Sequence, residues 1–168
     1  MSLFENLSIV SEDLPALSES NFEGLEEDYL YMRLTSRGLF FLLLAGVLTI
    51  LVFTTEVAAW MYFAPWLLLL LINFAVEIRG FGIKGYAIRQ KDVSYKSGLI
   101  WFSMTSVPFN RIQHCEVSQG PLGRLFDLAS VKVYTAGGST SDMVIRGLQK
   151  EKAQRLRDYI TKLSAEYE

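Results

Sequence analysis

Two long apolar runs in the first half of the chain constrain its structure more than any other feature. Residues 38–55 read GLFFLLLAGVLTILVFTT without a charged residue, and residues 57–78 read VAAWMYFAPWLLLLLINFAVEI with Glu77 as their one charge. A helix that crosses a hydrocarbon core of about 30 Å needs roughly 20 apolar residues. A helix on a soluble domain would instead show polar residues every three or four positions. The runs therefore predict a hairpin of two transmembrane helices over 38–55 and 57–78.

The residues that flank the runs predict how this hairpin is oriented. Glu56 separates the runs, and because a charge near the bilayer centre costs about 2.5–3.5 kcal/mol, we expect Glu56 in an exposed turn. Arg33 and Arg37 precede the first run, Arg79 and Lys84 follow the second, and no Lys or Arg lies between. The positive-inside rule then predicts a multi-pass protein of the inner (cytoplasmic) membrane with both termini in the cytoplasm.

Polar and aromatic residues inside the runs leave two details of the hairpin to be settled. Trp60, Tyr62 and Trp66 are predicted to form an aromatic belt at the turn side of the membrane. Asn73 has two interpretations: a hydrogen bond to the first helix or another subunit, or a position near the lipid headgroups, close to Glu77. We favour the headgroup position for Asn73.

Charge is distributed unevenly between the two sides of the hairpin. Residues 1–37 carry eight acidic and two basic side chains, a net charge of −6, and residues 79–168 carry fourteen basic and eight acidic ones, a net charge of +6. Residues 1–37 are predicted to be an acidic cytoplasmic segment that is partly disordered. Leu25, Tyr29 and Met32 fit one face of a short helix at the membrane interface, while the acidic groups fit docking on the basic domain.

The second half of the chain has the pattern of short strands followed by one helix. The predicted strands are rich in β-branched and aromatic residues and cover 83–89, 92–96, 98–102, 105–109, 112–117, 130–135 and 141–146. Gly137-Gly138-Ser139 reads as a hairpin turn, and Pro121 as the first position of one or two helical turns. Residues 148–163 predict an amphipathic helix that covers one face of the sheet, with apolar positions Leu148, Ala153, Leu156, Tyr159, Ile160 and Leu163.

Two segments of this region carry a family resemblance. YAIRQKDVSYKSG from Tyr86 and VPFNRIQHCEVSQGPLGRLFDLASVKVYTAGG from Val107 resemble the bacterial pleckstrin-homology (PH) domain of the YdbS-like membrane proteins. The resemblance covers about residues 84–147, and the preceding hairpin fits the same family. It implies an α+β membrane protein in which the hairpin is followed, over 79–168, by a PH-like antiparallel β-sandwich or barrel of about seven strands, capped by the C-terminal amphipathic helix. The family has no agreed activity and no defined catalytic set.

Reactive side chains are scarce in the sequence. The single histidine, His114, and the single cysteine, Cys115, are adjacent and precede Glu116. Adjacent residues of a strand point to opposite faces, so His114 and Cys115 are expected to diverge and not to form a catalytic pair. One His and one Cys also provide too few ligands for a His/Cys metal site. We therefore predict a protein that is not an enzyme, with no metal, no cofactor and no nucleic-acid partner.

Two functions remain compatible with the sequence. The first is a membrane-anchored module that assembles with other membrane proteins in an envelope complex, since relatives occur beside a larger companion with several PH-like domains; a second copy of the chain is another candidate partner. The expected contact residues are Trp101, Phe102, Phe109, Arg111, Gln113, His114 and Arg124, although we favour burial in the core for at least two of the three aromatic ones. The second function is recognition of anionic lipid headgroups, with expected contacts Lys84, Arg89, Lys91 and Lys96.

Overall fold

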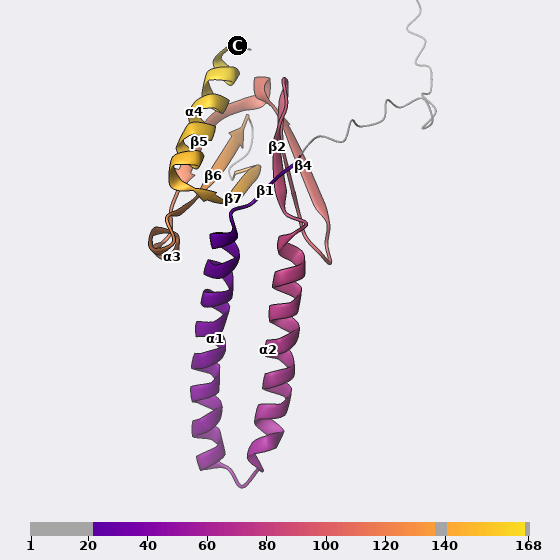
Figure 1. Ribbon diagram of the computed structural model, residues 1–168, viewed down its shortest axis with the longest axis vertical. Coiled ribbons are helices and arrows are strands. Elements are labelled where there is room, and N and C mark those ends of the chain that lie inside the picture. The colour runs from indigo at the N-terminus through magenta and orange to yellow at the C-terminus, as the bar shows by residue number, and fades with distance from the viewer. Residues whose placement is uncertain (1–21, 137–140, 167–168) are drawn as a thin grey trace, which may run out of the picture.

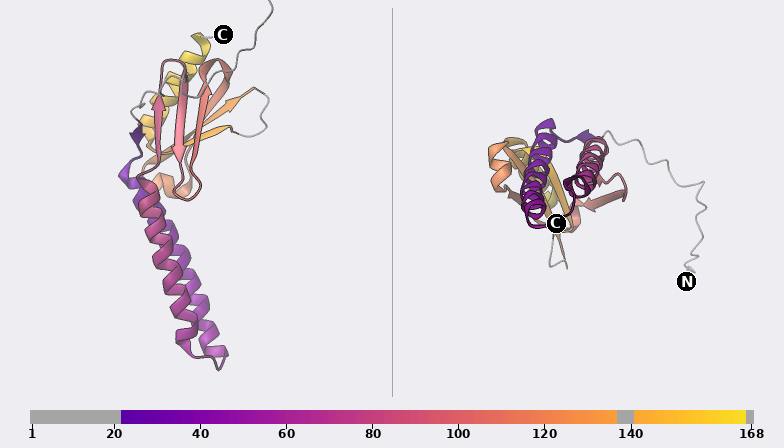
Figure 2. Two further views of the ribbon diagram at one scale, coloured as in Figure 1. Left: turned by 90° about the vertical axis from the view of Figure 1, so that its right-hand side faces the viewer. Right: turned by 90° about the horizontal axis from the view of Figure 1, so that it is seen from below.

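The computed structural model describes residues 22–136 and 141–166, which form a helical hairpin with a β-domain at one end (Figure 1). Helix α1 (Glu27–Thr54) and helix α2 (Ala59–Phe81) run side by side, as the further directions of Figure 2 also show. The domain sits on the end of the hairpin where α1 begins and α2 ends. The described strands and the C-terminal helix therefore all lie opposite the turn that joins α1 to α2.

Both hairpin helices are long and apolar enough to cross a membrane. Only 6% of the most apolar stretch of each helix is buried inside the protein, unlike the core helix of a soluble domain. Helix α1 begins at Glu27 instead of residue 38, because residues 27–37 continue the helix from the apolar run up to the domain. At its other end the Thr55 hydroxyl lies 3.1 Å from that of Tyr62, which ties the turn together, and Glu56 is exposed there.

The strands form two antiparallel sheets. One sheet has the order β1-β2-β3-β4, from β1 (Glu23–Gly24), β2 (Gly85–Ile88), β3 (Asp92–Ser97) and β4 (Ser103–Pro108). The other has the order β5-β6-β7, from β5 (Ile112–Ser118), β6 (Leu128–Thr135) and β7 (Met143–Gln149). A 3-10 turn, η2 (Phe109–Arg111), leads from one sheet to the other, and the short helix α3 (Pro121–Leu125) joins β5 to β6 with Pro121 in its first turn, as predicted.

Helix α4 (Lys150–Glu166) closes the domain by packing against β5, β6, β7 and η2. It buries Ala153, Leu156 and Ile160, whose spacing of three and four places them on one face. Tyr159 is half exposed and Leu148 belongs to β7, so the helix begins two residues later than predicted and uses fewer of the predicted positions. The fully buried side chains form one core between the sheets and α4: Val93, Phe109, Val131, Val133, Ile145, Leu148 and Ile160. This architecture confirms the predicted α+β fold.

One predicted strand, residues 98–102, is instead the turn between β3 and β4. Gly98 has φ +101°, and a Cβ there would lie 1.8 Å from the carbonyl oxygen of Trp101, so the chain reverses too tightly for a strand. The seventh strand comes from the N-terminal segment, since β1 pairs with β2 in the register Glu23↔Tyr86 and Gly24↔Gly85. The predicted hairpin turn at 137–139 lies outside the described residues.

Residues 22–37 therefore belong to the domain and are not a separate segment that precedes the hairpin. Leu25 and Tyr29 are 8% and 6% exposed and are part of the domain core, against which Met32 packs. The Glu26 N–H donates to the carbonyl oxygen of Gly147 at 3.1 Å, which fixes the start of α1 on β7. The predicted face of Leu25, Tyr29 and Met32 thus contacts protein, and residue 79 is not where the domain begins. Residues 1–21 lie outside the described part of the chain.

Candidate functional site at the junction of hairpin and domain

The carboxylate of Glu77, near the end of α2, is the centre of a charge cluster where the hairpin meets the domain. Its side chain is 5% exposed. Arg33 of α1 donates hydrogen bonds from Nε and Nη2 to the two carboxylate oxygens, both at 3.0 Å. Arg37 Nη2 lies 2.5 Å from Glu77 Oε2, and Lys84 Nζ lies 3.1 Å from Glu77 Oε1. Three cations, from α1 and from the segment before β2, therefore share one carboxylate.

Helical spacing brings this cluster together. Arg33 and Arg37 lie four residues apart on one face of α1, as Asn73 and Glu77 do on α2. Because the helices are antiparallel, Arg33 meets Glu77 while Arg37 donates from Nη1 to Asn73 Oδ1. Asn73 thus bonds to the first helix, the interpretation that the sequence analysis did not favour. Three cations against one carboxylate leave a surplus of two positive charges.

A second polar cluster fixes the N-terminal strand to α4. Lys152 Nζ lies 3.2 Å from a Glu23 carboxylate oxygen and 3.3 Å from one of Glu26, and the Tyr86 hydroxyl donates to Glu23. The Tyr86 bond is the main cause of a lowered Glu23 pKa, and burial together with that bond raises the pKa of Tyr86 to about 12. Burial alone would lower the Lys152 pKa, but its interactions with Tyr86 and Glu23 outweigh it and raise that pKa. For the described residues, the acidic segment therefore does meet the basic domain.

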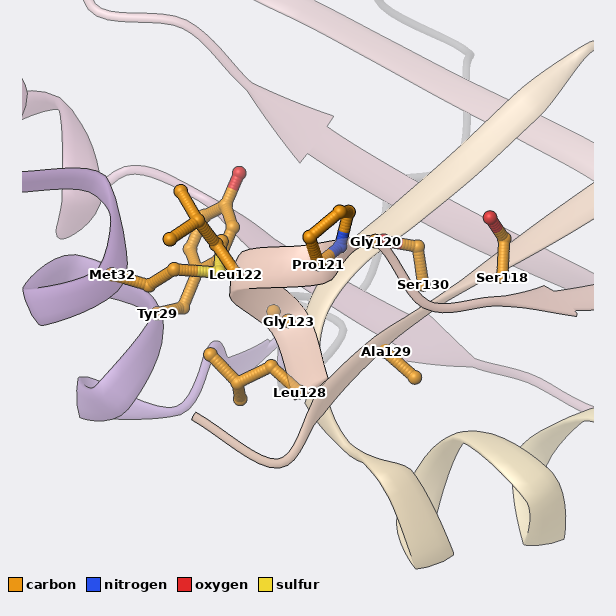
Figure 3. Close-up of a pocket in the computed structure, with 11 residues that line it drawn as sticks. Tyr29, Met32, Ser118, Gly120, Pro121, Leu122, Gly123, Leu128, Ala129 and Ser130 are labelled. Atoms are coloured by element: carbon orange, nitrogen blue, oxygen red, sulfur yellow. The ribbon is translucent and has the colours of Figure 1, made fainter. Parts of the chain in front are cut away.

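An apolar pocket of about 390 Å³ opens beside α1, between α3 and β6 (Figure 3). Tyr29 and Met32 reach into it from α1, and α3 contributes Pro121 and Leu122. The other lining residues are Ser118, Gly120, Gly123, Leu128, Ala129, Ser130 and Gly147. The pocket therefore combines the start of α1 with the segment around Pro121 that carries the family resemblance.

A run of exposed apolar side chains occupies the turn between β3 and β4. Leu99, Ile100, Trp101 and Phe102 are 41%, 73%, 86% and 63% exposed. Figure 1 shows this turn reaching down beside the domain end of α2. We call residues Leu99–Phe102 the apolar turn.

The four basic residues predicted to hold a lipid headgroup do not form one site. Lys84 is 17% exposed and engaged with Glu77, and Lys96, which pairs across the strands with Gly85, places Nζ 4.4 Å from the ring centroid of Phe22. The other two, Arg89 and Lys91, lie at the opposite end of the β2–β3 hairpin, where Arg89 pairs with Asp92 at 3.8 Å. An extended hairpin separates its two ends, so this set is divided.

The predicted partner contacts also scatter. Trp101 and Phe102 are exposed, so the expectation that at least two of the three aromatic residues are buried is wrong. Phe109 alone is buried, at 0% exposed, and cannot be a contact. Phe109 begins η2, where the chain passes from one sheet to the other, and its ring fills the core there. The remaining four are exposed on different elements: Arg111 on η2, Gln113 and His114 on β5, and Arg124 on α3.

Cys115 points away from His114 and Glu116, as strand alternation predicts. The His114 ring stacks on Tyr134 with centroids 4.4 Å apart, and Glu116 accepts hydrogen bonds from the Tyr134 hydroxyl at 3.1 Å and Lys132 Nζ at 3.4 Å. Cys115 packs on the core instead, and burial raises its thiol pKa to about 11. A thiol that stays protonated at neutral pH is a poor nucleophile. Within residues 22–136 and 141–166, no three His, Cys, Asp or Glu side chains are grouped as metal ligands.

The Glu77 cluster was not predicted, although the sequence carries a signal for it. Asn73 and Glu77 are the polar pair at the end of the second run, and Arg33 and Arg37 have the same spacing of four before the first run. In an antiparallel hairpin, equal spacing at matching depths places the two pairs opposite each other. What the pattern alone does not provide is Lys84, which joins the cluster only because the chain turns back after α2.

Comparisons with known proteins show what the chain is similar to. The family described as "Bacterial PH domain" matches residues 35–164. The transmembrane protein YdbS of Bacillus subtilis (strain 168) is 38% identical over 79 residues, which are 47% of this chain and 48% of YdbS, so the match spans about half of that relative. A crystal structure of a protein with a pleckstrin-homology domain from Shewanella loihica matches with a TM-score of 0.35 at 22% identity, over 50% of this chain and 69% of that one.

Proposed function

Because this chain belongs to the bacterial PH domain family and carries its domain on a transmembrane hairpin, we propose that it is a non-enzymatic assembly module of the inner membrane. Its partner is another membrane protein, one with further PH-like domains, within an envelope complex. The observation that carries the proposal is the apolar pocket of about 390 Å³ between α1, α3 and β6. Its volume falls in the range of roughly 300–1,000 Å³ in which proteins hold ligands, enough for apolar side chains of a partner.

The position of the pocket favours a membrane-protein partner. Met32, in its lining, precedes Arg33, and Arg33 is level with Glu77 near the end of α2. The pocket therefore lies at the height at which the hairpin leaves the bilayer, within reach of a neighbouring membrane protein. Its wall is closely packed, because a Cβ at Gly147 would lie 2.5 Å from the Tyr29 ring. A preformed wall avoids the entropy cost of ordering the site on binding.

A substitution in the lining of the pocket tests the proposal. Gly120 lines the pocket and a Cβ there meets nothing within 4 Å, so Gly120→Leu adds a bulky side chain to the lining without backbone strain. Thr161→Leu, on the exposed face of α4, is the matched control that adds the same side chain elsewhere. We expect a stoichiometric membrane protein to co-purify from native membranes with the wild type and Thr161→Leu, and at least about tenfold less of it with Gly120→Leu. Equal recovery with Gly120→Leu, or isolation of the wild type without a protein partner, would refute the proposal.

A second copy of the chain is the other protein partner to be distinguished. Native mass spectrometry of the purified complex in gentle detergent separates a homo-oligomer from a hetero-complex by mass. If the complex is a homo-oligomer and Gly120→Leu dissociates it, the pocket binds a second copy of the chain and not a different membrane protein.

The proposal places the domain and both flanks of the hairpin in the cytoplasm. Arg33, Arg37, Arg79 and Lys84 all lie at the domain end, while the turn over residues 55–58 carries no Lys or Arg. A reporter that is active only in the cytoplasm is expected to be active when it is fused after Glu168. An external signal would reverse this orientation without affecting the assembly proposal.

Anionic headgroup binding is the second candidate function, and one observation at Arg37 favours it. Its Nε is buried and has no hydrogen-bond partner among the described residues, in a cluster with a surplus of two positive charges. A lipid phosphate oxygen would supply that acceptor. In nanodiscs, phosphatidylglycerol in place of phosphatidylcholine is then expected to raise the unfolding temperature of the wild type but not of Arg37→Gln. An equal response of both proteins would remove this candidate.

A further inference from the structure

We infer that the apolar turn, Leu99–Phe102, is seated in the bilayer interface, so that the PH-like domain contacts the membrane directly as well as through its hairpin. The occupant of this surface is the zone of glycerol and headgroups on the domain side of the bilayer. The inference requires only that the hairpin spans the membrane, and it does not depend on the proposed partner.

The depth of the turn follows from its contacts with α2. A Cβ built on Gly80 would lie 3.6 Å from the Leu99 Cβ, and a small pocket is lined jointly by Val76 and Gly80 of α2 and by Leu99 to Trp101. At about 1.5 Å per residue, the 23 residues of α2 span about 35 Å, against about 30 Å for the hydrocarbon core. The last turn of α2, with the apolar turn beside it, therefore lies at the boundary between hydrocarbon and headgroups.

The chemistry of the turn fits that boundary. No charged residue occurs between Lys96 and Arg111 in the sequence, and Trp101 is the most exposed side chain of the turn at 86%. An indole combines an apolar body with one N–H donor, which is why Trp concentrates at membrane interfaces. Arg79 is exposed on α2 close by, at the level where headgroup phosphates accept cationic partners.

The positions of the tryptophans give an independent reason. The chain has three tryptophans. Trp60 lies beside the turn of the hairpin and is 69% exposed. Trp66 donates its Nε1–H to the Phe41 carbonyl oxygen at 3.3 Å, so it faces α1 and does not join the predicted aromatic belt. Neither hairpin helix has a Trp at its domain end. Trp101 occupies that level through the fold of the domain, and so supplies the second interface with the residue the helices lack there.

Fluorescence quenching in the chain of residues 1–168 tests this location of the turn. In Trp60→Phe/Trp66→Phe, Trp101 is the one remaining indole, and the protein is reconstituted in nanodiscs of phosphatidylcholine with or without bromine on the acyl carbons nearest the headgroup. We expect brominated lipid to lower Trp101 emission at least about twofold, and aqueous iodide to lower it little. Asn110→Trp with all three native tryptophans changed to Phe is the control, since Asn110 is exposed beyond the opposite end of β4; its emission is expected to respond to iodide and not to bromine.

Three results would overturn the inference. Trp101 quenched by iodide but not by bromine faces water. If neither quencher lowers Trp101 emission, the indole is covered by protein. If that protein is a second copy of the chain, dilution of the chain in lipid restores the quenching. Equal bromine quenching at Trp101 and at Asn110→Trp means that the whole domain lies on the bilayer, without a specific seat for the turn.

A second probe keeps the test informative if the change at Trp66 disturbs the hairpin. Ile100→Cys in a Cys115→Ala chain carries a nitroxide at a position that is 73% exposed. We expect its relaxation to be enhanced more by oxygen, which concentrates in lipid, than by a water-soluble nickel chelate. If the nickel chelate enhanced relaxation more than oxygen did, the turn would lie in water and the inference would be wrong.

Discussion

Replacing Glu77 by Gln is the most direct way to measure what the junction contributes to the fold. The substitution keeps the size of the side chain but removes the charge that balances Arg33, Arg37 and Lys84. Removing one partner of a buried ion pair costs about 3–5 kcal/mol, because the other charges stay behind without compensation. Arg33 and Arg37 are 37% and 30% exposed and so keep part of their hydration, which lowers our expectation to about 2–4 kcal/mol.

The single cysteine provides the assay. Cys115 is partly buried against the core, and burial raises its thiol pKa to about 11. The thiol therefore reacts slowly with a fluorogenic maleimide until the domain unfolds. For a chain of this size, about 2–4 kcal/mol corresponds to an unfolding temperature roughly 4–16 °C lower. The domain reports the loss because Leu25 and Tyr29 connect the start of α1 to its core.

Two further variants make this prediction refutable. Glu56→Gln makes the same change at the exposed turn of the hairpin and is expected to shift the unfolding temperature by less than about 2 °C. Glu77→Asp keeps the charge but shortens its reach, and we expect an intermediate loss. If Glu77→Gln unfolds at the temperature of Glu56→Gln, the three cations are satisfied without the carboxylate and the reasoning is wrong.

Four other expectations follow from the described contacts. Gly147→Ala should cost about 2–4 kcal/mol in a thermal melt, because Gly147 has φ +71° and a Cβ there would lie 2.5 Å from the Tyr29 ring; Gly120→Ala, with open space, should cost less than about 0.5 kcal/mol. Phe109→Ala should cost about 3–5 kcal/mol, since the ring is 0% exposed; a loss below about 1 kcal/mol would contradict its place in the core. Stability against urea should fall by about 1–2 kcal/mol as pH rises from about 10 towards 12, because the raised pKa of Tyr86 favours the folded state only while the Tyr86 hydroxyl is protonated. The fall should be smaller in Tyr86→Phe, which has no hydroxyl to titrate. The lowered Glu23 pKa has the opposite sign, so its contribution should be present above about pH 4.5 and lost as pH falls below that.

The junction explains how a domain can be held at a defined height on a hairpin. A flexible linker would allow the domain to move freely, but β1 and the first turns of α1 enter the domain before the chain crosses the membrane, and Lys84 returns to the hairpin after it. The pocket beside α1 and the apolar turn beside α2 then have fixed positions relative to the hairpin. Such preorganisation lowers the entropy cost of any contact that the domain makes there.

Local pattern alone determined the hairpin, most strands and the C-terminal helix, because apolar runs, alternation and a spacing of three and four are properties of neighbouring residues. It also separated His114 from Cys115, because adjacent side chains on a strand face opposite sides. Tertiary structure decided which aromatic residues face outward: Trp101 and Phe102 are exposed in a tight turn, while Phe109, a few residues later, fills the core.

Tertiary structure alone also assembled the junction. Arg33 and Glu77 lie 44 residues apart in the chain, and Glu23 and Lys152 lie 129 apart. A short strand such as β1 has too few residues to show any periodicity, so only its partner β2 defines it. The sequence by itself therefore determined what each segment prefers locally, and packing between distant segments decided which charges share a carboxylate and which apolar residues remain exposed.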